Sequence, residues 1–170
     1  MKKAIIIILS ILCIVIIPII SYMIMDHKMN NTTPNPTNAK KTYQEQVKEN
    51  TKTIEGISYK ITLTDQSSVD AVIATMHKMT HQKVLADEKW GAIPMTDDTI
   101  KQVENIVVNS NFEIKENLLH ILEKWKTGDF STIDEDHNYF WKYAGGTIGE
   151  AYGILSPEEE ATFIENNFKK

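Results

Sequence analysis

The chain has 170 residues, a formal net charge of −5 and a single cysteine, Cys13. Once an apolar N-terminal run is set aside, this length allows one modest domain. Because Cys13 lies inside that run, the domain cannot contain an internal disulfide and depends on its core for stability. Between residues 128 and 166 there are nine acidic residues against one base, Lys142. That charge excludes this end as a surface for nucleic acid or anionic lipid headgroups.

Residues 4–25 form an uncharged, almost continuously apolar run. About 20 such residues in a helix cross the hydrocarbon core of a bilayer, so we expect a transmembrane anchor here. Residues 1–3 contain two lysines and are expected on the cytoplasmic side, which places everything after the anchor outside the cell membrane. The alternative, a cleaved signal peptide, requires a shorter apolar core followed by an A-x-A-like pair of small residues, and the run ends without one.

Residues 26–52 lack apolar periodicity and are expected to form a flexible tether, which leaves residues 53–170 as an extracytoplasmic domain. Within it, Ile57, Tyr59, Ile61 and Leu63 alternate with polar residues, the pattern of one short strand. The sequence offers no partner strand. The segment therefore pairs with a second chain, packs as an extended arm, or is not a strand.

From residue 66 onward the apolar spacing is helical and predicts helices that begin near residues 67, 96, 113, 133 and 156. The first is expected to run to about Trp90, with Val84 in its apolar stripe. The fold class is therefore mainly α: an anchor, a tether, and a small helical bundle with at most one short strand. We expect three aromatic side chains to be buried in its core: Trp125, Phe140 and Phe168.

The histidines are the most suggestive candidates for a functional site. His77 and His81 lie four residues apart, which lets two imidazoles on one helix face bind one Zn²⁺ or similar divalent ion. They share a strip along the helix with Asp70 and Glu88. A third ligand must come from elsewhere, and Asp136 or His137 on the fourth helix are the candidates.

Both the strip on the first helix and His137 have a simpler interpretation that involves no metal. The strip is then a boundary whose side chains bury their stems and keep their polar ends in water. His137 is expected to be at least partly buried among Ile133 and Phe140, where a backbone carbonyl or a carboxylate would satisfy it.

Catalytic signatures are missing from the sequence. It contains no G-x-S-x-G, H-E-x-x-H or phosphate-binding G-x-x-x-x-G-K pattern. Residues 145–153 hold four of the seven glycines, but no strand precedes them, so we expect a helix end and close packing there and no nucleotide loop. The leading hypothesis is a membrane-tethered binding or interaction module of unknown ligand, with a protein partner outside the membrane and no cofactor. The alternative is a metal-dependent protein or enzyme that uses His77, His81 and Asp136 or His137.

Four strings in the chain carry a family resemblance: residues 77–83, 89–96, 135–141 and 145–149. Through them the chain resembles an uncharacterised family of small membrane-anchored proteins from Bacillus and its relatives, over roughly Val69 to Phe168. The resemblance implies a Gram-positive source and an extracytoplasmic domain. It implies no catalytic residue.

Overall fold

The computed structural model describes residues 41–169. The anchor expected at residues 4–25 and most of the expected tether lie outside this range. Within the described part of the chain, no helix combines the length and the apolar character needed to cross a membrane.

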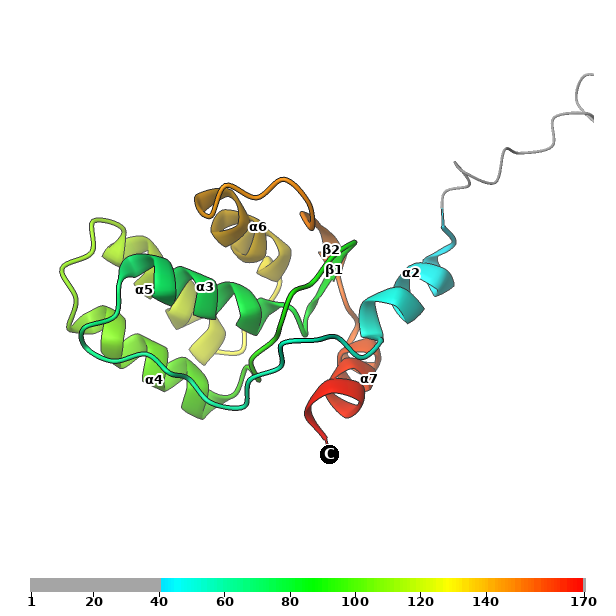
Figure 1. Ribbon diagram of the computed structural model, residues 1–170, viewed down its shortest axis with the longest axis horizontal. Helices are drawn as coiled ribbons and strands as arrows, with labels where there is room; N and C mark the ends of the chain where they lie inside the picture. The colour runs from blue at the N-terminus through cyan, green and yellow to red at the C-terminus, as the bar shows by residue number, and fades with distance from the viewer. Residues whose placement is uncertain (1–40, 170) are drawn as a thin grey trace, which may run out of the picture. The chain divides into compact units, whose positions relative to one another are not determined.

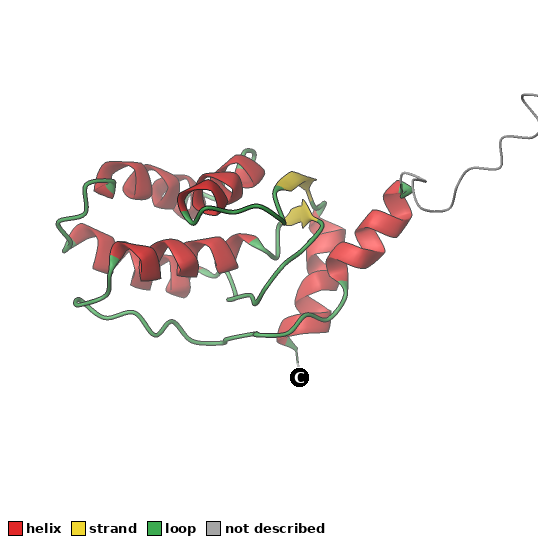
Figure 2. Ribbon diagram, turned by 45° about the horizontal axis from the view of Figure 1, so that its top comes forward, coloured by secondary structure: helices red, strands yellow, loops and turns green. Residues whose placement is uncertain are grey.

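The described residues form six helices and one antiparallel pair of short strands, so the mainly α prediction is confirmed. The elements are α2 (Tyr43–Thr51), α3 (Val69–Thr80), β1 (Val84–Ala86), α4 (Asp97–Val108), α5 (Lys115–Lys126), α6 (Ile133–Tyr143), β2 (Ala151–Ile154) and α7 (Pro157–Phe168). Helices α3 to α6 pack together on one side, and α2 pairs with α7 on the other (Figure 1). The two strands lie between these groups, as a view coloured by secondary structure also shows (Figure 2).

Side-chain caps fix where four of the described helices begin: α2 at Thr42, α3 at Ser68, α4 at Thr96 and α7 at Ser156. The Ser68 hydroxyl accepts a hydrogen bond from the Ala71 amide at the start of α3. Reciprocal capping boxes begin α4 at Thr96 and α7 at Ser156, and Pro157 occupies the first helical position of α7. Such caps satisfy amides that have no partner within the helix, each worth about 1 kcal/mol. The helix starts predicted near residues 67, 96 and 156 are confirmed.

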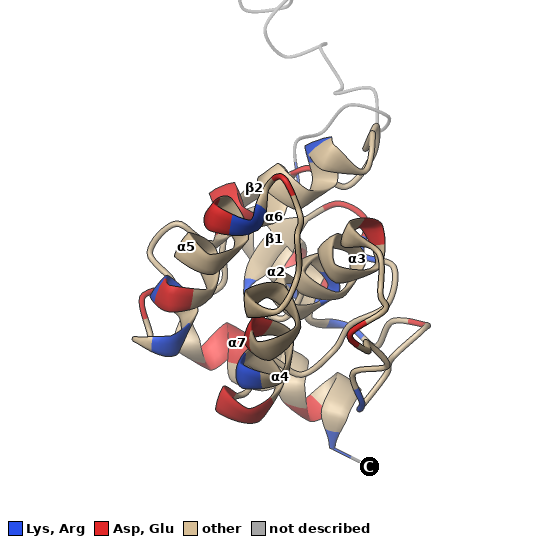
Figure 3. Cartoon of the chain, turned by 90° about the vertical axis from the view of Figure 1, so that its left-hand side faces the viewer, with Lys and Arg blue, Asp and Glu red and all other residues tan. Residues whose placement is uncertain are grey.

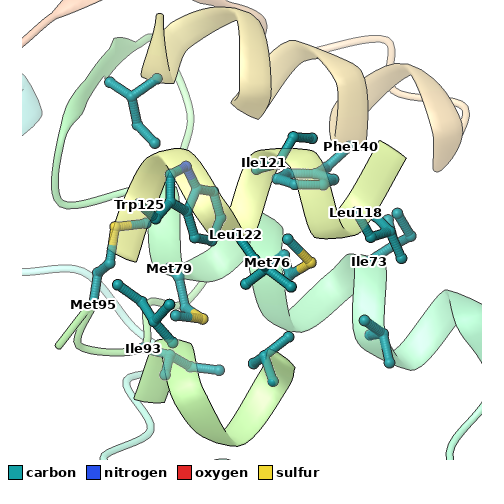
Figure 4. Close-up of a cluster of buried hydrophobic side chains, with 14 of the residues drawn as sticks. Ile73, Met76, Met79, Ile93, Met95, Leu118, Ile121, Leu122, Trp125 and Phe140 are labelled. Carbon is teal, nitrogen blue, oxygen red and sulfur yellow. The ribbon is translucent and has the colours of Figure 1, made fainter. Parts of the chain in front are cut away.

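The core lies between α3, α4, α5 and α6 (Figure 4). Trp125 and Phe140 are fully buried there, with their rings edge to face at 6.1 Å, as predicted. Phe168 is only partly buried, and Phe163 is the α7 aromatic that is fully buried. The prediction for α7 was wrong because this helix packs on α2 and not on the four-helix core. The first turns of α6 and α7 are acidic (Figure 3).

The predicted first helix is shorter than expected, because α3 ends at Thr80 and Val84 belongs to β1. Val84 faces Ile154 and Leu85 faces Gly153 across the ladder. The domain therefore has two short strands where at most one was expected. All three β1 residues are buried, and a short, fully buried apolar run has no alternation that would distinguish a strand from a helix.

The segment expected as a strand at residues 57–63 makes a single bridge, from Ile57 to Ala92. Ile61 and Leu63 pack against the core, so the segment is the extended arm that was one of the three alternatives. Residues 42–52, expected within the tether, instead contain α2. Its buried contacts are polar: the Asn50 side chain accepts from the Ala86 amide and donates to the Tyr152 hydroxyl. A helix held in this way leaves no apolar stripe in the sequence.

Candidate metal centre

Three histidines from two helices converge at one end of the contact between α3 and α6. His77 lies in the last turn of α3, His81 is the residue that caps its C-terminus, and His137 lies in the second turn of α6. One ring nitrogen of each lies within 4.8 Å of the other two, and the Nε2 atoms of His77 and His137 are 2.9 Å apart. The i, i+4 spacing brings the first two rings to one face of α3, and the packing of α6 on α3 supplies the third.

His81 is held by a backbone carbonyl on the connection between β1 and α4. Its Nδ1 lies 2.5 Å from the Gly91 carbonyl oxygen, and the whole residue is buried. Gly91 has φ +75°, and a Cβ on it would lie 2.7 Å from the Gly56 carbonyl oxygen. Only glycine fits this position, so the close approach of residues 56 and 91 places the carbonyl that orients His81.

His137 is held by its neighbour in the sequence. Its Nδ1 lies 3.0 Å from Oδ1 of Asn138, which also accepts a hydrogen bond from the Ala151 amide at 2.8 Å. The Asn138 amide nitrogen donates to the Ala151 carbonyl, which fixes the orientation of the side chain. The first residue of β2 therefore determines which Asn138 atom faces His137.

These contacts define which nitrogen of each ring carries the proton. A carbonyl oxygen can only accept, so Nδ1 is the donor in both His81 and His137, and Nε2 keeps its lone pair. His77 then donates its Nε2 proton to Nε2 of His137. A metal ion between the rings would replace this one hydrogen bond, and His77 would carry its proton on Nδ1.

Burial keeps the three imidazoles uncharged. Desolvation, with smaller contributions from His137 and Lys78, lowers the pKa of His77 from 6.5 to about 3. The pKa of His81 lies well below its ordinary value for the same main reason, and burial also lowers that of His137. Neutral imidazole is the form that binds metal ions.

The other predicted candidates lie elsewhere. Asp136 is buried, but its carboxylate accepts hydrogen bonds from Lys124 at 2.7 Å and from Trp125 Nε1 at 2.9 Å. It ties α6 to α5 and is not part of the histidine cluster. Asp70 and Glu88 line a pocket beside the cluster without joining it, and Glu88 lies beyond the end of α3.

The pocket has a volume of about 630 Å³ and opens next to the cluster. His77 and His81 line it, whereas His137 is fully buried behind them. One wall is α3, and the opposite wall is the end of α6 with the glycine-rich segment 145–149. Water or a small ligand in the pocket thus has access to the two α3 histidines.

Two residues that orient the histidines, Gly91 and Asn138, were missed from the sequence, and so was the buried Lys89. In the sequence, Gly91 only follows the expected end of the first helix near Trp90, and an asparagine next to a histidine is too common to carry a signal. Lys89 is buried, its Nζ donates to the Asn50 carbonyl at 3.1 Å, and desolvation lowers its pKa to about 7. Among residues 41–169, Lys89 has no ion pair with a carboxylate, and a buried lysine of this kind leaves no sequence pattern.

Fold and site together define a class: a small, mainly helical domain with a buried three-histidine cluster at the edge of a pocket. Residues 76–165 match the model of a family of unknown function, DUF6241, and because this match covers more than half of the chain, the chain belongs to that family. The matched range contains all three histidines. The prediction of an uncharacterised family is confirmed. No curated protein and no solved structure matches the chain.

The lowered pKa values predict how the metal-free protein responds to acid. As pH falls through 6.5, the unfolded chain binds protons at these three histidines, whereas the folded chain does so only at lower pH. Their contribution to stability is therefore complete above pH 6.5 and is lost progressively below it. The free energy of unfolding should fall by up to about 1.4 kcal/mol per pH unit for each histidine.

Urea denaturation with a chelator present, between pH 7.5 and 5, measures this slope. The His77→Gln variant should show a shallower slope than the parent. His120→Gln is the matched control, because His120 is exposed on α5. Equal slopes for the parent and His77→Gln would contradict the assignment of a partly buried, neutral His77.

Proposed function

We propose that this domain binds a divalent transition-metal ion through His77, His81 and His137. The observation that carries the proposal is the convergence of one nitrogen from each ring within 4.8 Å. A tetrahedral ion with metal–nitrogen distances of about 2.0–2.1 Å needs ligand nitrogens only slightly more than 3 Å apart. Small movements of buried rings would therefore complete the site.

The supporting contacts favour a metal over a purely structural cluster. Histidines that bind metals almost always donate their other ring N–H to a carbonyl or a carboxylate, which fixes the tautomer. His81 does so to the Gly91 carbonyl and His137 to the Asn138 side-chain oxygen. In a structural cluster, the hydrogen bond from His77 would account for the lone pair on Nε2 of His137, but nothing would require His81 to keep a lone pair on its Nε2.

The ligand set also favours particular ions. Three neutral imidazoles suit Zn²⁺, Cu²⁺, Ni²⁺ and Co²⁺ better than Ca²⁺ or Mg²⁺, which prefer oxygen ligands. Three protein ligands leave a fourth position, and its exit is the pocket lined by His77 and His81. The proposed function is therefore metal-dependent binding in that pocket, the alternative that the sequence offered. The interaction module is retained only as the outcome if no metal binds.

The proposal also includes a location. The uncharged run at residues 4–25 and the lysines before it support an anchored protein whose metal-binding domain lies outside the cell membrane. The family resemblance described above points to a Gram-positive cell.

Metal binding is tested by calorimetry and thermal denaturation with Zn²⁺. The parent should bind one ion and melt at a higher temperature in its presence, because a ligand of the folded state stabilises that state. Replacing any one of His77, His81 or His137 by Ala should weaken binding about 100-fold or more and remove the thermal shift.

Two controls separate the cluster from its surroundings. His120→Ala should bind Zn²⁺ like the parent. Asp136→Asn should also keep its affinity, although it loses stability, because its carboxylate contacts Lys124 and Trp125. Unchanged zinc affinity in His137→Ala would contradict the proposed ligand set.

Location is tested by labelling single cysteines with a membrane-impermeant maleimide. In a Cys13→Ala background, Asn35→Cys should be labelled on intact cells, and Lys3→Cys only after the cells are permeabilised. The reverse pattern, or recovery of the protein outside the membrane fraction, would overturn the proposed orientation and anchoring.

A further inference from the structure

Exposed apolar side chains gather around the mouth of the pocket beside the histidines. In residues 41–169, eight large hydrophobic side chains are exposed, and three of them line this pocket. They are Trp90, 69% exposed, Ile148, 58%, and Tyr143, 43%. Single exposed apolar residues are ordinary, but their concentration around one concavity marks a binding surface.

The wall that carries Ile148 is fixed before any ligand arrives. Trp141 Nε1 donates to the Ile148 carbonyl at 2.8 Å, which ties the segment to α6. A Cβ on Gly146 would lie 2.3 Å from the Trp141 ring, so the backbone packs directly on that ring. Gly149 has φ +89°, and a Cβ there would lie 2.7 Å from the Glu88 carbonyl oxygen. The glycines thus serve close packing, and the pocket is preformed.

The charge of the pocket depends on the metal. Its lining contains two carboxylates, Asp70 and Glu88, and one amine, Lys78, for a formal charge of −1. The three neutral imidazoles do not offset the two charges of a divalent ion, so the loaded pocket would carry a formal charge of +1. A ligand with one negative charge is favoured in that state, and its anionic oxygen can take the fourth coordination position.

The volume of the pocket sets the size of the ligand. A volume of about 630 Å³ falls within the usual range for small-molecule sites, roughly 300–1,000 Å³. A ligand that reaches from the metal to the mouth passes between Trp90 on one side and the segment containing Ile148 on the other. That part of the ligand must be apolar.

We propose that the metal-loaded pocket binds small monocarboxylates with an apolar or aromatic body, the carboxylate on the metal and the body between Trp90 and Ile148. This inference rests on the proposed metal site. The carboxylate displaces the water that otherwise fills the fourth position, and no covalent bond in the ligand changes.

The experiment uses the full-length protein in detergent micelles, loaded with Co²⁺, whose visible absorption bands respond to its fourth ligand. Acetate and 3-phenylpropanoate share the carboxylate and differ in the apolar body. The parent should bind 3-phenylpropanoate at least about tenfold more tightly than acetate, because the phenyl ring leaves water. Trp90→Ala and Ile148→Ala should each reduce this preference at least threefold.

Val108→Ala is the matched control, because Val108 is 49% exposed on α4 and does not line the pocket. It should keep the full preference. A preference that falls in Trp90→Ala and Ile148→Ala but not in Val108→Ala comes from the pocket, because partition of the ligand into micelles would be the same for all of these proteins. If Co²⁺ binds and the two acids bind equally, the ligand inference is overturned and the metal site stands. If the parent binds no Co²⁺, the metal site fails, and the inference fails with it.

Discussion

The site depends on bringing one partly buried and two buried imidazoles together where α3 meets α6. In the described part of the chain, no carboxylate is hydrogen-bonded to any of the three rings. Burial without a negative partner lowers the pKa of each ring and keeps it neutral. A buried carboxylate in contact would raise the pKa of a ring, and a metal ion would then have to displace the added proton in order to bind. Asp136, next to His137 in the sequence, is held away from the cluster by Lys124 and Trp125. The two adjacent residues of α6 thus have separate roles: Asp136 ties α6 to α5, and His137 belongs to the histidine cluster.

The surrounding backbone holds two of the three histidine rings in place. Residues 55–58 run beside residues 91–92, with Gly91 donating to the Glu55 carbonyl and Ser58 to that of Ala92. This pairing places the carbonyl that orients His81. On the other side, Ala151 begins β2, pairs with Ala86 of β1, and fixes the Asn138 side chain that orients His137. The extended arm and the small sheet therefore act as supports for two of the three rings.

The sequence predicted the parts of the fold that depend on local chemistry. Helix starts at Ser68, Thr96 and Ser156 follow from caps within four residues, and the pairing of His77 with His81 follows from helical spacing. What it could not predict depends on contacts between distant segments. Asp136 and His137 differ by about 100° around α6, so only the position of α3 and α5 decides which of them reaches the cluster. Similarly, which side of α7 is buried depends on its packing against α2. The polar contacts of α2 leave no apolar pattern in the sequence, so the burial of Phe163 was not predicted.

X-ray absorption at the zinc edge tests the central claim most directly, because it reports the number and type of ligands around the ion. The account predicts nitrogen and oxygen neighbours at about 2.0–2.1 Å, with the outer-shell scattering of three imidazoles. The His137→Ala variant, loaded at high zinc concentration, should lose the scattering of one imidazole. A first shell made only of oxygen, or a spectrum unchanged in His137→Ala, would contradict the three-histidine centre.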